Sequence, residues 1–370
     1  MSPTFDDTNT LFDFVVRNGN GVKGLVDSGI KNVPEKYIQP SSERINKIVG
    51  SQNSSSGLQQ CISPIDLSLL DGPNHDEVVK AIVNASERIG FFQVVNHGIP
   101  ADLLESLKQA AHQFFTQPPD EKAIYLPGEG RSRLVKYGTS FSPEKEKALE
   151  WKDYLNMVYT NDAEALEHWP NQCKEVALRY LKSSYKIVKK LLEILFENLG
   201  EKLEDSRLDS LTGRKLVNML FYPPCPNPDL TVGVGRHSDI GTLTVLLQDS
   251  IGGLHVKVEE DVVSGQKEEW IEIPPFPNAL VINIGDALQI ISNGRYISAE
   301  HRVRTTSKGS RVSIPFFTIP TPTEKIGPLP QVIKHDGVAR YREVLYQEYM
   351  NNYFGKAHDG KKSLDFARIN

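Results

Sequence analysis

Apolar residues recur at helical spacing in the first half of the chain. The pattern runs through 76–89, 101–115 and 174–199, and it returns near the end of the chain at about 340–354. Each repeat places its apolar side chains on one helical face, which is typical of an amphipathic helix packed on a core. A compact apolar run at 91–95 predicts a strand between the first two helices. The N-terminal half is therefore expected to be mainly helical.

The pattern changes after Gly213, where short runs rich in Val, Ile, Thr and Phe follow one another and turn residues separate most of them. The runs cover 216–222, 231–237, 242–248, 254–258, 269–273, 279–284, 301–305 and 311–319. About eight short strands with no helix between them predict an antiparallel jelly roll, or double-stranded β-helix. The expected fold class is α+β, with the N-terminal helical region packed against this core.

These patterns divide the chain into four segments. Residues 1–60 form a leader that ends in a polar, low-complexity loop at 50–60. Residues 61–212 form the mainly helical region, and residues 213–320 form the jelly-roll domain. Residues 321–370 supply a C-terminal helix and tail.

Composition indicates the class of substrate and the cellular compartment. The 370 residues carry a net charge of −5 and no dense basic stripe, so a small-molecule substrate is expected and nucleic acid is not. The cysteines Cys61, Cys173 and Cys225 are odd in number and widely spaced, which favours a reducing compartment. No stretch is long and apolar enough for a membrane span, and the N-terminus lacks a secretory signal. The cytoplasm is the expected location, without a membrane partner.

His237, Asp239 and His301 form a candidate metal site. His237 and Asp239 lie two residues apart at the end of a predicted strand, so both side chains point to one face. His301 opens another predicted strand, which the jelly roll can bring alongside. Two imidazoles and one carboxylate leave coordination positions open, and this set suits non-haem Fe(II) and oxygen chemistry. An isolated His-x-Asp pair is a common chance pattern, so the triad needs a second signal.

Arg311 and Ser313 supply that signal. They lie two residues apart on a predicted strand whose other positions are apolar, including Val312 and Ile314. A buried guanidinium needs an anionic partner, and this segment contains no acid. The planar fork of arginine matches a carboxylate, so a dicarboxylate cosubstrate would provide the partner. A distant Asp or Glu of the chain remains the alternative partner.

Two other patterns carry less weight. Residues 19–24 satisfy the glycine spacing of a dinucleotide-binding loop, but no strand precedes and no long helix follows, so a turn is expected. Basic residues at 122–136 could contact the phosphates of coenzyme A, although a solvated loop is favoured.

The chain resembles the plant 2-oxoglutarate-dependent dioxygenases. The resemblance rests on His237-x-Asp239, His301 and Arg311-x-Ser313, together with flanking segments at 90–98, 150–154, 222–226 and 282–294. It runs from about residue 10 to the C-terminus. It implies Fe(II), 2-oxoglutarate and O2 as cofactor and cosubstrates, with ascorbate as reductant. It also implies that no protein side chain beyond the metal ligands takes part in catalysis.

The resemblance also assigns roles to individual residues. Tyr222 matches a tyrosine that contacts 2-oxoglutarate, and Tyr137 and Phe317 match positions that line the aromatic substrate pocket, although ordinary core packing is nearly as good an interpretation for both. Leu220 stands where many relatives carry an asparagine, so one possible hydrogen bond to the cosubstrate is missing.

Within the family, the chain looks most similar to the coumarin-pathway branch. The leader at 20–25 and the tail at 358–362 carry this likeness, with further runs at 135–141, 159–162 and 302–306. It implies a small aromatic substrate and favours the 8-hydroxylation of scopoletin to fraxetin. The alternative is the ortho-hydroxylation of feruloyl-CoA or p-coumaroyl-CoA, which leads to scopoletin or umbelliferone.

Two other classes remain open on the residues alone. A zinc hydrolase also uses two histidines and a carboxylate, but it leaves Arg311 and Ser313 unexplained. A non-catalytic jelly-roll sensor would keep the pocket without the reaction.

Overall fold

The computed structural model describes residue 5 and residues 7–45, 63–128, 133–140, 143–259, 268–355 and 360–369. The loop predicted at 50–60 lies outside these residues.

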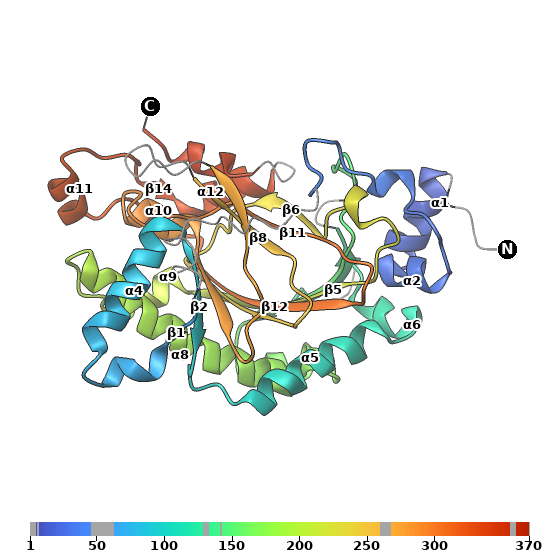
Figure 1. The fold of residues 1–370 in the computed structure, drawn as a ribbon, viewed down its shortest axis with the longest axis horizontal. Helices are drawn as coiled ribbons and strands as arrows, with labels where there is room; N and C mark the ends of the chain where they lie inside the picture. The colour runs from blue at the N-terminus through green and yellow to red at the C-terminus, as the bar shows by residue number, and fades with distance from the viewer. Residues whose placement is uncertain are drawn as a thin grey trace.

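Two facing β-sheets form the centre of the described chain (Figure 1). The larger sheet has the strand order β1-β2-β10-β7-β12-β5-β4-β3, and the smaller has the order β6-β11-β8-β9. Neighbouring strands are antiparallel except β1 and β2, which are parallel. This arrangement is the predicted jelly roll with helices against it, and it confirms the α+β fold class.

All eight runs predicted after Gly213 form strands. The bounds of these strands are β5 (Arg214–Tyr222), β6 (Val234–His237), β7 (Leu243–Gln248), β8 (Leu254–Val258), β9 (Glu269–Glu272), β10 (Leu280–Ile284), β11 (His301–Val303) and β12 (Arg311–Ile319). A separate pair, β13 (Lys325–Ile326) and β14 (Val344–Leu345), follows them.

Helices cover the outer face of the larger sheet. The predicted helices form as α4 (His75–Arg88), α5 (Ala101–Phe115) and α8 (Lys174–Asn198), and α5 and α8 run beneath the sheet in Figure 1. The other α-helices among the described residues are α1 (Thr8–Phe12), α2 (Gly21–Asp27), α6 (Pro119–Lys122), α7 (Asp162–His168), α9 (Asp205–Leu211), α10 (Asp286–Ile291), α11 (Pro330–Asp336) and α12 (Tyr346–Phe354). Within the described chain, no helix has both the length and the apolar character that crossing a bilayer requires.

The two faces of strand β12 contact different surroundings: one faces the hydrophobic core and the other faces a cavity. Val312, Ile314 and Phe316 point to the helices and join the main hydrophobic core. Burying each such side chain contributes about 1.5–3 kcal/mol, which holds the strand in register. The alternate residues, among them Arg311 and Ser313, point to the space between the sheets. Because side chains alternate along a strand, apolar positions on one face fix polar positions on the other.

Two local predictions were wrong, and one region contains strands that the sequence patterns did not predict. Helix α10 lies between β10 and β11, where no helix was expected, because all six of its residues are buried and it has no polar face to give a helical period. The helix expected over 340–354 begins only at Tyr346, after β14. The N-terminal half also contains β3 (Val135–Thr139) and β4 (Asp153–Tyr159), which extend the larger sheet beside β1 (Ile65–Asp66) and the predicted β2 (Phe91–Val95).

The glycine motif at 19–24 is the start of helix α2 rather than a free turn. The buried Asp153 carboxylate accepts hydrogen bonds from the backbone N–H groups of Val22 (2.7 Å) and Lys23 (2.9 Å). Gly21 has a φ of +67°, and a Cβ there would lie 2.4 Å from Asp153 Oδ1. The helix N-terminus therefore holds a carboxylate of its own chain in the place where a phosphate would bind.

Asp153 gives a testable dependence of stability on pH. Burial raises its pKa from 3.8 to about 6, although the hydrogen bonds from Lys23 and Val22 oppose the shift. The folded protein therefore binds this proton more tightly than the unfolded chain does. Asp153 contributes most to stability below about pH 4, and this contribution is lost as the pH rises through about 6.

We expect Asp153→Asn to reduce the free energy of unfolding more at pH 4.5 than at pH 7, by a difference on the order of 1–3 kcal/mol. Urea unfolding of both proteins across this pH range measures the difference. Asp205→Asn, at an exposed carboxylate, is the matched control and should run parallel to the wild type. Parallel curves for Asp153→Asn would contradict the assignment.

Candidate active site

Strand pairing brings the two predicted histidine ligands together. His237 ends β6 and His301 opens β11, and the two residues are direct partners across the antiparallel ladder. Their ring centroids lie 4.2 Å apart. Asp239 follows two residues after His237, and one ligand atom of each residue lies within 4.8 Å of the others. The structure thus brings together the three residues expected from the sequence.

The orientation of the two rings is set by backbone carbonyls. His237 Nδ1 is 2.9 Å from the carbonyl oxygen of Gly235, and His301 Nδ1 is 3.2 Å from that of Ala299. A carbonyl only accepts, so each Nδ1 carries a proton and each Nε2 presents its lone pair. The Nε2 atoms lie 3.7 and 3.8 Å from Asp239 Oδ1. Two imidazole lone pairs and a carboxylate oxygen facing one point could hold Fe(II).

The second oxygen of Asp239 is held by two residues that the sequence analysis missed. Asp239 Oδ2 accepts hydrogen bonds from Thr244 Oγ1 (2.6 Å) and Asn283 Nδ2 (2.8 Å). Thr244 on β7 and Asn283 on β10 are direct partners in the larger sheet. Asn283 is the polar residue of an otherwise apolar strand, and Thr244 lies among apolar residues in β7, which was the available signal. Together they leave Oδ1 free to face the histidines.

A second buried carboxylate supports the segment between His237 and Asp239. Asp286, at the start of α10, accepts hydrogen bonds from Ser238 Oγ (3.2 Å), Ser298 Oγ (2.6 Å) and Tyr349 OH (2.7 Å). Burial raises the pKa of Asp286 to about 6, against the effect of these hydrogen bonds. Since Ser238 separates His237 from Asp239, this network ties the segment between them to α10 and to the C-terminal helix α12.

Arg311 is buried without an acidic partner among the described residues. It is 1% exposed, and it donates to Ser313 Oγ (3.0 Å) and Gln248 Oε1 (3.3 Å). Its guanidinium carbon lies 4.9 Å from the centre of the Tyr222 ring. Within the part of the chain that the structure describes, Arg311 Nε and Gln248 Nε2 have no hydrogen-bond partner. A buried charge in this state fits a carboxylate ligand, because an anion would both neutralise it and use the free donors.

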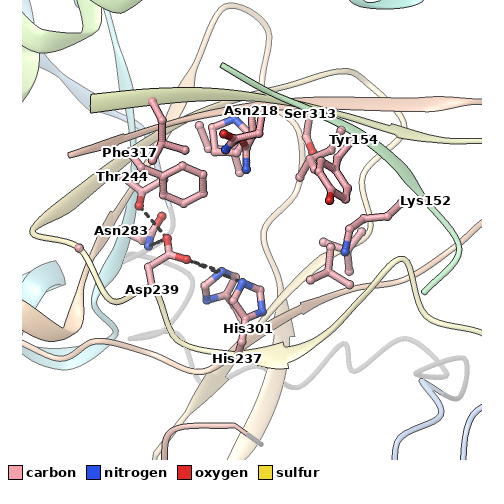
Figure 2. Close-up of a pocket in the computed structure, with 18 of the residues that line it drawn as sticks. Lys152, Tyr154, Asn218, His237, Asp239, Thr244, Asn283, His301, Ser313 and Phe317 are labelled. Carbon is pink, nitrogen blue, oxygen red and sulfur yellow. Dashed lines mark hydrogen bonds and ion pairs between the residues drawn. The ribbon is translucent and has the colours of Figure 1, made fainter. Parts of the chain in front are cut away.

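One cavity of about 330 Å³ joins the metal-site residues to this arginine. Figure 2 shows His237, Asp239 and His301 on the wall of the space that Ser313 and Phe317 also line. Much of the remaining wall is apolar, formed by Phe91, Leu216, Leu220, Leu246, Phe317 and Phe354, among others. Asn156 Nδ2 donates to Asn218 Oδ1 (2.5 Å) and adds a polar patch. The cavity can therefore hold a carboxylate, a metal and a flat apolar ring together.

The structure separates the two residues predicted to line a substrate pocket. Phe317 lines the cavity, as does Leu220, which offers no hydrogen bond there. Tyr137 does not line it: its ring packs 5.9 Å from Phe114 in the helical core. Because β3 alternates its faces, the neighbouring Lys136 reaches the cavity instead.

Lys122, one of the basic residues considered for coenzyme A, is also a core residue. It is 2% exposed, its Nζ donates to the Phe115 carbonyl (3.1 Å), and it lies 5.2 Å from the Tyr137 ring centre. Its ammonium is therefore not available to a phosphate.

A jelly roll whose cavity joins a His-Asp-His cluster to a buried arginine is the architecture of an iron- and 2-oxoglutarate-dependent oxygenase. Family comparison agrees: residues 214–320 match the 2OG-Fe(II) oxygenase superfamily, and residues 62–175 match the non-haem dioxygenase N-terminal model named for morphine synthesis. The chain belongs to this superfamily. It is a 2-oxoglutarate-dependent dioxygenase that uses Fe(II), 2-oxoglutarate and O2. This decides against the zinc hydrolase and the non-catalytic sensor.

Relatives of assigned activity match the chain over its full length. It is 61% identical to scopoletin 8-hydroxylase of Arabidopsis thaliana, over 100% of this chain and 99% of the relative. It is 48% identical to feruloyl CoA ortho-hydroxylase 1 of the same plant, with 100% of both chains covered. Among solved structures, JOX2 in complex with 2OG, Fe and JA matches with a TM-score of 0.79 and 29% identity, covering 94% of this chain and 97% of that one. The rice dioxygenase for auxin oxidation matches with a TM-score of 0.67 and 25% identity, covering 83% and 100%.

The hydrogen bond from Thr244 to Asp239 gives a prediction for metal affinity. We expect Thr244→Val, which keeps the shape but removes the hydroxyl, to weaken Fe(II) or Co(II) binding by about 10- to 100-fold, as loss of such supporting bonds typically does. Anaerobic Co(II) titration followed by absorption measures the dissociation constant.

Thr318→Val is the matched control, since Thr318 is also buried in this sheet but bonds the Leu243 carbonyl (2.8 Å) and does not contact Asp239. Equal affinities for the wild type and Thr244→Val, or an equal loss in the control, would contradict the role of Thr244.

Proposed function

We propose that the protein is an aromatic hydroxylase of coumarin biosynthesis that converts scopoletin to fraxetin by 8-hydroxylation. The observation that carries the reaction type is the single cavity shared by the His-Asp-His cluster and the unneutralised Arg311. The identity of 61% to scopoletin 8-hydroxylase supports the choice of substrate. The free thiols of Cys173 and Cys225 agree with a reducing compartment, and we propose the cytosol.

In this proposal, His237 Nε2, Asp239 Oδ1 and His301 Nε2 hold Fe(II). The carbonyls of Gly235 and Ala299 keep both imidazoles in the tautomer that a metal requires. When bound, iron, 2-oxoglutarate and O2 supply the oxidant: the 2-oxo acid is converted to succinate and carbon dioxide, and one oxygen atom enters the aromatic ring. The residues of the chain position the reactants and exclude water from them.

Arg311 and Ser313 then bind the distal carboxylate of 2-oxoglutarate, with Tyr222 beside them. Ser313 Oγ lies between the guanidinium (3.0 Å) and the Tyr222 hydroxyl (3.4 Å), so all three groups converge on one place. The Nε of Arg311 and the Nε2 of Gln248 would gain the acceptors that they lack. Leu220 offers the cosubstrate only an apolar contact here.

The cavity supports a small bicyclic substrate. Its volume of about 330 Å³ lies at the small end of the range for ligand pockets. Phe317 and Phe91 present aromatic surface to a flat ring. A coenzyme A thioester would have to keep its nucleotide part outside this space.

A second candidate is the ortho-hydroxylation of feruloyl-CoA or p-coumaroyl-CoA. The identity of 48% to feruloyl CoA ortho-hydroxylase 1 supports it. Lys136, which lines the cavity with an exposed side chain, offers a cation to a phosphate, but Lys122 does not.

The role of Arg311 can be measured directly. We expect Arg311→Met to raise the KM for 2-oxoglutarate at least 30-fold, because removing one partner of a buried charge pair costs about 2–5 kcal/mol. Succinate formation against 2-oxoglutarate concentration measures the change. Arg304→Met is the control, since Arg304 pairs with Asp229 outside the cavity (2.9 Å) and should leave this KM unchanged. An unchanged KM in Arg311→Met would refute the binding role.

A parallel assay tests the substrate. Purified protein with Fe(II), 2-oxoglutarate and ascorbate is offered scopoletin in one reaction and feruloyl-CoA in the other. We expect fraxetin from scopoletin, with about one succinate per product molecule. Product from the thioester alone would overturn the substrate and leave the reaction type standing.

A further inference from the structure

A buried ion pair lies on the cavity wall and has no role in the site described so far. Lys152 and Glu150 are 5% and 4% exposed, and the Lys152 ammonium is hydrogen-bonded to Glu150 Oε2. Lys152 lines the cavity, and Figure 2 shows its amino group directed into the space that His237 and His301 also line. The Lys152 charge therefore faces the space in which a substrate ring would lie, and Glu150 holds it there.

The Lys152 ammonium has N–H donors that no described residue accepts. An ammonium carries three N–H groups, and within the described residues Lys152 Nζ makes one hydrogen bond, to Glu150. Burial lowers the pKa of Lys152, but the charge and hydrogen bond of Glu150 outweigh this effect and leave the pKa above its ordinary value. The group therefore stays charged and can donate toward the cavity.

The ion pair is held in a fixed position relative to the metal-site histidine. Glu150 Oε1 accepts a hydrogen bond from the backbone N–H of Gly235 (2.7 Å), and the carbonyl of the same Gly235 accepts from His237 Nδ1 (2.9 Å). The backbone N–H of Glu150 is held by Ser140 Oγ (3.0 Å). One peptide segment thus links the cation to a candidate iron ligand.

A contribution to folding stability does not explain the presence of this buried ion pair. A buried ion pair loses about as much in desolvation as it gains in attraction, and apolar residues often serve as well. Arg311, the other buried cation of the cavity, already faces the proposed position of the 2-oxoglutarate carboxylate. Lys152 is the buried cation that remains for a second anionic or acceptor group.

We propose that Lys152 binds the ring hydroxyl of the aromatic substrate as a phenolate and so selects the ring carbon that is hydroxylated. This inference rests on the proposed function, in which scopoletin carries a hydroxyl at position 7, next to the position attacked. That hydroxyl is conjugated to the lactone carbonyl, which makes it more acidic than a simple phenol, and its proton passes to solvent on binding. With the oxygen held at Lys152, the neighbouring carbon has a fixed place relative to His237.

The test uses the full-length double variant Glu150→Gln/Lys152→Met. Removing both charges avoids leaving an unpaired buried carboxylate, and Gln keeps an acceptor for Gly235. Lys215→Met is the matched control, because Lys215 is a half-buried lysine that stacks on Tyr185 (4.4 Å) and does not line the cavity. Melting temperature and 2-oxoglutarate binding show that each protein is folded.

The main readout is the absorption of scopoletin bound to the anaerobic Co(II)–2-oxoglutarate protein, at a pH below the pKa of free scopoletin. We expect the long-wavelength phenolate band with the wild type and with Lys215→Met, and its loss in the double variant. The double variant should also bind scopoletin at least 10-fold more weakly. The wild type should prefer scopoletin to its 7-O-methyl ether by a similar factor, and the double variant should lose this preference.

Two failures can be told apart. If the wild type makes fraxetin but binds scopoletin in its neutral form, or if the folded double variant binds scopoletin as the wild type does, the role of Lys152 is wrong and the function stands. If the wild type converts only the thioester and does not bind scopoletin, the proposed function itself fails, and the inference fails with it.

Discussion

The site depends on one pair of residues in a β-ladder, His237 opposite His301. An antiparallel pair holds two directly opposed side chains on one face of the sheet at short range, so the β6–β11 register alone sets the 4.2 Å separation of the rings. A shift of one residue would turn one imidazole to the other face. Asp239 reaches the same space two residues after His237, and Asp286 holds the intervening Ser238 by a hydrogen bond.

The larger sheet lets a hydrophobic core and a polar cavity share the same strands. On β12, the residues that pack on α5 and α8 alternate with Arg311 and Ser313, and the same alternation on β10 places Asn283 at Asp239. Core packing therefore supplies the rigidity that the polar face needs. The buried guanidinium of Arg311 is costly by itself, and this cost makes the cavity selective for an anion.

Three buried carboxylates have different structural roles. Asp153 satisfies the N-terminus of α2, which explains why a glycine pattern typical of nucleotide binding occurs without that function. Asp286 holds Ser238, which lies between two site residues, and Glu150 positions a cation. The partners of Asp153 and Asp286 are backbone N–H groups and hydroxyls from distant parts of the chain, whereas the ammonium that Glu150 holds is two residues away in sequence.

The sequence by itself determined the eight strands after Gly213, the three long N-terminal helices and the candidate roles of His237, Asp239, His301, Arg311 and Ser313. These follow from local periodicity and from residue types whose burial needs a partner. Only the tertiary structure decided that Tyr137 packs in the core, that α10 is a helix, and that Thr244, Asn283 and Lys152 face the cavity. Where both faces of a helix or strand are buried, the apolar pattern does not show which side chains point toward the cavity and which toward the core. The pleat and register of distant strands then decide which side chains meet.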